Sequence, residues 1–162
     1  MVLNVVLVHP EIPHNTGAVG RLCVALGMRL HLVKPLGFQL TEAQVRRVGL
    51  DYWQHVDLTV HDDWDAYVES EQPSQLIFSS TRGTKAYTDC RPEPGCALVF
   101  GNESSGLPKD FYTRYAADLY RVPMPGPHAR SLNLSLSAAI FAYEVHRQLS
   151  PSLPLNLCVP CG

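Results

Sequence analysis

Short continuous runs of apolar residues alternate along this chain with segments in which apolar residues recur every three or four positions. The continuous runs predict buried strands, and the recurring ones predict helices that bury one face. Strands separated by helices favour an α/β fold with a mainly parallel sheet. The predicted strands are residues 2–8, 29–33, 75–80, 96–100 and 119–122, and the predicted helices are residues 15–26, 41–48, 61–71 and 133–149.

The ends of the first predicted helix carry clear local signals. We expect Asn15 or Thr16 to cap it, because their side-chain oxygens can accept hydrogen bonds from the free amides of a first turn. Gly27 is expected to end it. The last predicted helix is the longest, and its apolar residues near helical spacing are Leu136, Ile140, Tyr143 and Leu149.

The composition fits one compact domain. The chain has 162 residues, of which 46% are hydrophobic, so it can bury a sizeable core. We assign residues 1–149 to this domain and residues 150–162 to a proline-rich tail that packs loosely. The formal charge of −2 excludes a surface that is positive all over, so any surface that binds nucleic acid must be local.

Nothing in the sequence predicts a membrane segment, a secreted protein or a metal site. No apolar run reaches the length of a membrane span, and residues 1–9 lack a basic leader and a cleavage site. The five cysteines, an odd number without regular spacing, favour a reducing cytoplasm. Cys158 and Cys161 stand without a second pair nearby, so they do not favour zinc binding or redox chemistry.

Three polar segments follow predicted strands, where a doubly wound sheet binds its ligand. They are residues 13–17 with Arg21, residues 99–108 around Glu103, and residues 122–135. Each also has a purely structural interpretation: a capped helix with a solvated arginine, a tight turn with a solvated glutamate, and a helix capped by Ser131 or Asn133. Since neither Gly-x-Gly-x-x-Gly after the first strand nor a phosphate-binding loop is present, a conventional nucleotide enzyme is disfavoured.

Together, the three segments resemble the motifs of the SPOUT class of RNA methyltransferases, in the same order. The chain is most similar to the TrmL-type tRNA wobble-position 2′-O-methyltransferases. The resemblance extends from Leu3 to about Leu149 and is most specific at residues 10–17, 47–52 and 130–135. It implies a C-terminal trefoil knot, which general folding rules alone would reject.

The resemblance also implies an activity and its partners. The methyl donor would be S-adenosyl-L-methionine, with no metal, and the acceptor a ribose 2′-hydroxyl of tRNA. Within the most similar group, the target is the cytidine or modified uridine at wobble position 34 of tRNA-Leu. The family works as a homodimer in which the partner chain completes each site.

Roles for individual residues follow from the resemblance as well. The catalytic group would be Asn15, Arg21, Glu103, Ser131 and Asn133. The donor would bind to Ser79, Ser80, Thr81, Gly101, Glu103, Val122, Met124, Ser131, Leu132 and Asn133. RNA would contact Arg46, Arg47, Arg130 and Tyr143, and further candidates for phosphate contacts are Arg82, Lys85, Arg114 and Arg121.

The chemistry restricts what Arg21 can do. A ribose hydroxyl is a poor nucleophile near neutral pH, so the site must hold it against the methyl carbon and stabilise the charge that develops on its oxygen. Related enzymes assign activation of the hydroxyl to the arginine at this position. Because a neutral guanidinium at pH 7 would cost about 7 kcal/mol, charge stabilisation and orientation are favoured over proton abstraction.

One position departs from the most similar group. Related wobble enzymes carry Gly-Pro-Glu-Thr-Arg-Gly where this chain has Gly101-Asn-Glu-Ser-Ser-Gly106, so Ser105 replaces an arginine. Other tRNA and rRNA methyltransferases also carry Gly-Asn-Glu, which leaves the target position more open than the reaction. The alternatives are methylation at another tRNA or rRNA position and a non-catalytic RNA-binding protein of the same fold. The joint presence of Arg21, Glu103, Ser131 and Asn133 disfavours the second.

Overall fold

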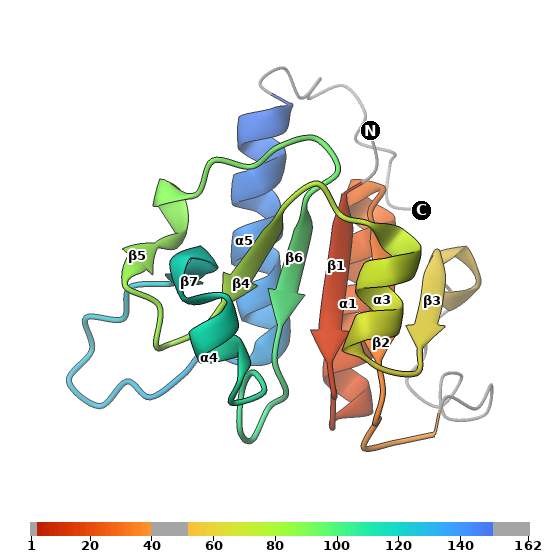
Figure 1. Ribbon diagram of the computed structural model, residues 1–162, viewed down its shortest axis with the longest axis horizontal. Coiled ribbons are helices and arrows are strands. Elements are labelled where there is room, and N and C mark those ends of the chain that lie inside the picture. Colours follow the sequence, from red (N-terminus) through yellow and green to blue (C-terminus); the bar gives the residue numbers. More distant parts are fainter. Residues whose placement is uncertain (1–2, 40–51, 151–162) are drawn as a thin grey trace, which may run out of the picture.

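The computed structural model describes residues 3–39 and 52–150, which form a seven-stranded parallel sheet with helices on both faces (Figure 1). The strand order is β3-β2-β1-β6-β4-β7-β5. The strands are β1 Asn4–Val8, β2 Arg29–Val33, β3 Leu58–His61, β4 Leu76–Ser79, β5 Lys85–Ala86, β6 Ala97–Phe100 and β7 Leu119–Arg121. The helices are α1 Pro13–Leu26, α3 Trp64–Glu71, α4 Phe111–Arg114 and α5 Leu134–Leu149, with short 3-10 turns at Trp53–His55, Tyr87–Asp89 and Ala116–Asp118.

The alternation of side chains along β1 divides the interior into two cores. Val5 and Leu7 belong to the core that α1 and α5 cover, whereas Val6 and Val8 belong to the core under α3 and α4. Figure 1 shows α1 and α5 behind the sheet and α3 and α4 in front of it. A strand buried on both faces explains why the sequence shows a continuous apolar run here. The predicted single α/β domain with a parallel sheet is confirmed.

The start of α1 differs from the prediction. The helix begins at Pro13, its N-cap residue is Ile12, and no side chain of the cap residue bonds to the first turn. The predicted cap at Asn15 or Thr16 is therefore wrong: both residues lie inside the helix and are buried. Proline suits the first helical position because the amide that it lacks has no partner there. The end is as predicted, since Gly27 adopts a left-handed conformation with φ of 63°.

The predicted helix 61–71 contains a strand end and a shorter helix. His61 is the last residue of β3, and α3 begins at Trp64, where the Asp63 side chain accepts a hydrogen bond from the Ala66 amide at 2.8 Å. Strand β3 was not predicted, because only one of its four residues is fully buried and it has no continuous apolar run. The predicted helix 41–48 and the tail 151–162 lie outside the described residues.

Helix α5 has two apolar faces. The buried one consists of Leu134, Ala138, Phe141, Ala142 and Val145. Of the residues singled out by their spacing, Leu136 is 57% and Tyr143 54% exposed, Ile140 is half-buried, and Leu149 packs against the core. Within residues 3–39 and 52–150, no helix has the length and hydropathy needed to cross a membrane.

Candidate active site

A cavity of about 470 Å³ opens at the carboxyl ends of β4 and β6. Four segments that are distant in sequence surround it: the loop after β4, the glycine-containing loop after β6, the start of α1 and the start of α5. The cavity lies near the boundary between β1 and β6, where the strand order changes direction and open parallel sheets bind their ligands. This position agrees with the one expected for the three polar segments.

The loop after β6 has a backbone that only glycine permits. Asn102 and Gly106 form a short antiparallel bridge that folds the loop back on itself, and Gly106 has φ of 76°. A Cβ atom on Gly101 would lie 2.1 Å from the carbonyl carbon of Gly106. Gly101 therefore allows the two arms of the loop to touch and exposes their backbone groups to the cavity.

Ser105 forms hydrogen bonds within this loop. Its backbone amide and its hydroxyl both donate to Oδ1 of Asn102, at 2.7 and 2.8 Å. The position at which related wobble enzymes carry an arginine is thus used here for a local hydrogen bond.

Glu103 stabilises the start of α1. Its carboxylate accepts hydrogen bonds from the Glu11 amide at 2.8 Å, from the Ile12 amide at 3.1 Å and from Nδ2 of Asn15 at 3.0 Å. The interpretation of Glu103 as a solvated residue in a tight turn is therefore wrong. A negative charge at the N-terminus of a helix is favourable because of the helix dipole, so Glu103 performs the role that the sequence assigned to a cap.

Asn15 connects the start of α1 to the start of α5. It donates to Glu103 through Nδ2 and accepts from Nδ2 of Asn133 at 2.9 Å through Oδ1. The Oδ1 atom of Asn133 accepts from the Ser135 amide at 2.8 Å, which confirms Asn133 as the cap of α5. Three of the five predicted catalytic residues, Asn15, Glu103 and Asn133, are thus joined in one chain of hydrogen bonds on the cavity wall.

Most of the predicted site residues surround the cavity. Those on its wall are Asn15, Ser79, Ser80, Thr81, Gly101, Glu103, Ser131, Leu132 and Asn133. Val122 and Met124 are not among the lining residues, and Val122 packs against the core instead. The resemblance therefore selected residues that mostly surround one cavity, and their roles stay predictions.

Arg21 does not line the cavity of its own chain. It is exposed on α1, and its guanidinium carbon lies 5.4 Å from the centre of the Tyr52 ring. The Tyr52 hydroxyl donates to the Gly17 carbonyl at 3.0 Å, which fixes the ring against the helix. Burial raises the pKa of Tyr52, and the charge of Arg21 opposes this rise. Within one chain Arg21 therefore lies apart from the cavity residues, and its catalytic role stays a prediction.

Arg82 and Tyr112 complete the wall of the cavity, and the sequence had not indicated Tyr112. The Tyr112 hydroxyl accepts from the Leu107 amide at 3.3 Å, and the guanidinium of Arg82 lies 4.5 Å above the Tyr112 ring. Tyr112 belongs to α4, a helix of four residues that is too short to show any periodicity. Arg82, predicted as a phosphate contact, therefore stands at the cavity as a cation held by an aromatic ring.

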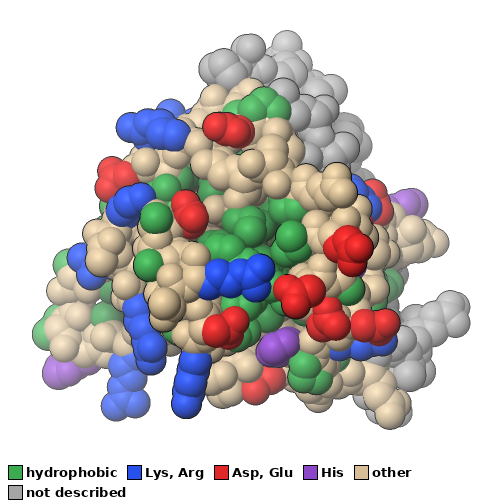
Figure 2. Space-filling model, in the orientation of Figure 1, with side chains coloured by type: hydrophobic (Ala, Val, Ile, Leu, Met, Phe, Trp, Pro, Cys, Tyr) green, Lys and Arg blue, Asp and Glu red, His purple; other side chains and the backbone are tan. Residues whose placement is uncertain are grey.

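Positive side chains gather on one side of the molecule. The exposed cations of this region are Arg82, Lys85, Lys109, Arg114, Arg121 and Arg130. In Figure 2, Lys and Arg side chains follow the left and lower-left margin, over β5, β7 and the connection to α5, whereas acidic side chains gather over the lower end of α3. The cations lie on the cavity side of a chain whose formal charge is −2. Arg46 and Arg47 lie outside the described residues.

We expect Glu103→Gln to lower the free energy of unfolding by about 1–3 kcal/mol. The change removes the negative charge at the start of α1 and replaces one acceptor oxygen by a donor that faces an amide. Urea denaturation is the measurement, with Glu93→Gln, on an exposed loop, as the matched control. Equal stability of the two variants would show that Glu103 does not support α1.

Comparisons with known proteins assign this arrangement to a class. Residues 2–143 match the model of the SpoU rRNA Methylase family, and the chain belongs to that family. The tRNA (cytidine(34)-2'-O)-methyltransferase of Burkholderia ambifaria is 47% identical over 148 residues, which cover 90% of this chain and 94% of the relative.

Solved structures share the fold along most of the chain. One, described as "Structural insights into the 2-OH methylation of C/U34 on tRNA", superposes with a TM-score of 0.85 and 44% identity and covers 93% of this chain and 98% of that one. The AdoMet-bound rRNA methyltransferase of Sinorhizobium meliloti has a TM-score of 0.79 over 91% of this chain and 56% of its own, and at 24% identity it shows the fold alone.

Proposed function

We propose that this protein transfers the methyl group of S-adenosyl-L-methionine to the ribose 2′-hydroxyl of wobble position 34 in tRNA. The observation that carries the proposal is the cavity at the carboxyl ends of β4 and β6, walled by the three segments that resemble the family motifs. The wobble position is supported by the relative from Burkholderia ambifaria, which matches 90% of the chain. The substrate would be cytidine or modified uridine 34 of tRNA-Leu, modified in the cytoplasm.

The donor would occupy the cavity. Its adenosine and methionine parts would contact the loop after β4, the backbone of the Gly101–Gly106 loop and the segment from Val122 to Asn133. The same fold holds AdoMet in the Sinorhizobium meliloti enzyme. The rigid loop around Gly101 presents backbone donors and acceptors that need no rearrangement on binding.

The transfer is an in-line displacement. The bond from the donor sulfur to the methyl carbon breaks as the bond from the ribose oxygen to that carbon forms, and the hydroxyl proton passes to water or a phosphate. The sulfonium is already activated, so no metal is required. The protein contributes position and charge: Ser131 and Asn133 orient the reacting groups, and Arg21 stabilises the developing negative charge.

Arg21 would reach the reacting hydroxyl from a second copy of the chain. In one chain it lies outside the cavity, on the exposed side of α1. Helix α5 packs against α1 and exposes Leu136 and Tyr143, an apolar surface that suits a homodimer. The tRNA would contact Arg130 and Tyr143 near the dimer boundary, together with the cations around the cavity.

The same resemblance supports a trefoil knot in the C-terminal half. Strand β7 lies next to β4, and the Ser80 amide donates to the Tyr120 carbonyl at 2.9 Å. A Cβ atom on Gly83 would lie 2.6 Å from the carbonyl carbon of Tyr120, so the loop after β4 presses directly on β7. The chain then returns through residues 122–133 to the start of α5, which is the return path that a threaded loop requires.

Leu136→Asp is expected to convert the dimer into a monomer and to abolish methylation. A charge in the centre of a small apolar interface leaves an unpaired, desolvated carboxylate. Light scattering at micromolar concentration measures the mass, and Val60→Asp, at an exposed position of edge strand β3, is the matched control. A monomeric Leu136→Asp variant with full activity would contradict the shared site.

Donor binding tests the proposed function directly. Isothermal titration of the metal-free protein should show one donor, or one demethylated product, bound for each chain. Thr81→Trp, which places a large ring at the mouth of the cavity, should weaken both by about tenfold or more. If neither molecule binds the wild-type chain, the proposed methyl transfer is excluded.

A further inference from the structure

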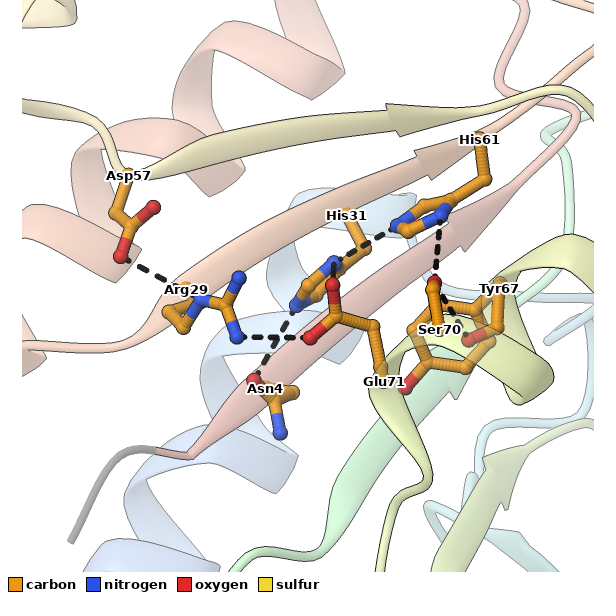
Figure 3. Close-up of polar contacts among 8 residues, drawn as sticks. All are labelled: Asn4, Arg29, His31, Asp57, His61, Tyr67, Ser70 and Glu71. Atoms are coloured by element: carbon orange, nitrogen blue, oxygen red, sulfur yellow. Dashed lines mark hydrogen bonds and ion pairs between the residues drawn. The ribbon is translucent and has the colours of Figure 1, made fainter.

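A second polar cluster lies away from the cavity, between the sheet and helix α3 (Figure 3). It consists of His31 on β2, His61 at the end of β3 and Glu71 at the end of α3. His31 is fully buried, His61 is 6% exposed and the Glu71 side chain is 14% exposed. None of the three lines the proposed active site. Buried histidines with a carboxylate are costly unless each polar atom has a partner.

Hydrogen bonds on the outer side of each imidazole orient the two rings. His31 Nε2 lies 3.2 Å from Oδ1 of Asn4, an acceptor, so this nitrogen carries the hydrogen. The Ser70 hydroxyl donates to the Tyr67 carbonyl at 3.2 Å and lies 3.4 Å from His61 Nδ1. When His31 is neutral, its Nδ1 is therefore an acceptor that faces the inside of the cluster.

The inner nitrogens of the two rings face each other. His31 Nδ1 and His61 Nε2 are 3.0 Å apart, so the hydrogen on His61 Nε2 bonds to His31 Nδ1 when both rings are neutral, and a metal ion would take the place of that hydrogen. Burial lowers the pKa of His31 to about 4 and that of His61 as well, although the charge of Glu71 opposes both changes.

The same three side chains form a ligand set for a metal ion. One ligand atom from each of His31, His61 and Glu71 lies within 4.8 Å of the other two, and Glu71 Oε1 is 3.9 Å from His31 Nδ1. Zinc bonds of 2.0–2.1 Å in a tetrahedron place ligand atoms about 3.3 Å apart, so small side-chain adjustments suffice. Two neutral imidazoles and a carboxylate suit zinc and its neighbours.

The surroundings resemble the outer shell of a metal site. Asn4 and Ser70 orient the two rings, and the guanidinium of Arg29 holds Oε2 of Glu71 at 2.8 Å, which leaves Oε1 directed towards His31. Tyr67 packs with its ring centre 5.3 Å from that of His31 and 5.2 Å from that of His61. Its buried hydroxyl has no hydrogen-bond partner among the described residues.

We propose that His31, His61 and Glu71 bind one divalent transition-metal ion of the zinc class, which fastens α3 to β2 and β3. The ion is structural and lies apart from the methyl-transfer site, so the proposal is independent of the proposed function. Arg29 pairs with Glu71 at 2.8 Å and with Asp57 at 3.4 Å, so one cation faces two carboxylates and a net negative charge remains to attract the ion.

Cobalt titration of the full-length, metal-free protein tests the site. The cysteine pair outside the described residues is first removed by Cys158→Ser and Cys161→Ser, so that thiolates there cannot bind the probe. We expect one Co²⁺ per chain, visible absorption bands typical of four-coordinate nitrogen and oxygen ligands, and no thiolate charge-transfer band. A hundredfold excess of Zn²⁺ over its Kd should raise the melting temperature by about 5–10 °C.

Matched variants identify the ligands. His61→Gln and Glu71→Gln, each made separately, should lose the cobalt bands and the thermal shift, whereas His55→Gln, on an exposed 3-10 turn, should keep both. Glu71→Gln keeps the size of the side chain, so it remains informative if His61→Gln does not fold. The proposal is overturned if the parent protein gives no cobalt bands, if they include a thiolate band, or if Glu71→Gln binds cobalt like its parent.

Discussion

Gly101→Ala is expected to abolish donor binding and to lower the free energy of unfolding by about 3 kcal/mol or more. The added methyl carbon would lie 2.1 Å from the carbonyl carbon and 2.3 Å from the carbonyl oxygen of Gly106, and both neighbours are backbone atoms. The loop must open to relieve this overlap, because backbone cannot rotate aside as a side chain can. Urea denaturation and isothermal titration of the donor measure the two effects.

The matched control for Gly101→Ala is Gly126→Ala. A Cβ atom on Gly126 would have Ala129 Cβ as its nearest neighbour, at 3.8 Å, which is an ordinary contact. This variant should therefore keep stability and donor affinity near those of the wild type. If Gly101→Ala also binds the donor like the wild type, the loop after β6 is not part of the donor site.

Arg21→Ala should slow the methyl-transfer step by about 10²-fold or more and leave folding and donor binding nearly intact. Removal of one group that stabilises charge in the transition state has an effect of this size. Arg21→Lys keeps the charge but loses the planar pair of donors, so it should restore the rate only in part. Single-turnover methylation with saturating donor and tRNA measures the step, and Arg147→Ala, at another exposed arginine, is the control.

Co-expression of two inactive variants tests whether Arg21 acts in the site of its own chain or in that of the partner chain. Arg21→Ala leaves the cavity intact, and Asn133→Ala leaves Arg21 intact, so a mixed dimer would contain one complete site. Co-expression of equal amounts should restore about a quarter of the wild-type activity, because half of the dimers are mixed and each has one working site of two. No recovery would place Arg21 in the site of its own chain, and a wild-type rate for Arg21→Ala alone would remove it from the site.

The sequence predicted the strands and helix ends that depend on residues close together in the chain. Continuous apolar runs located five strands, Gly27 marked the end of α1, and Asn133 was one of two expected caps of α5. The three polar segments were placed correctly because strands of one parallel sheet bring their carboxyl ends to the same edge. Strands β3 and β5 were missed, since both lie at the sheet margins and expose much of their side chains.

Contacts between distant residues could not be predicted from spacing. Glu103 lies 92 positions from Glu11 in sequence and still supports the start of α1, which the sequence had assigned to a local cap. The pairing of His31 with His61 depends on the register of β2 and β3, in which Val33 lies opposite His61. Arg21 follows a familiar motif, but the direction in which it points depends on the packing of α1 and on Tyr52.

The most direct measurement is the location of the methyl group on tRNA. Unmodified tRNA-Leu and tRNA-Leu purified from a strain without the enzyme are incubated with the protein and S-adenosyl-L-methionine, digested, and analysed by mass spectrometry. We predict one added methyl group on the ribose of nucleotide 34, in at least one of the two tRNA preparations, and transfer about 10²-fold slower or more with Arg21→Ala. A methyl group on a base or at another position, or no transfer to either tRNA, would contradict the proposed activity.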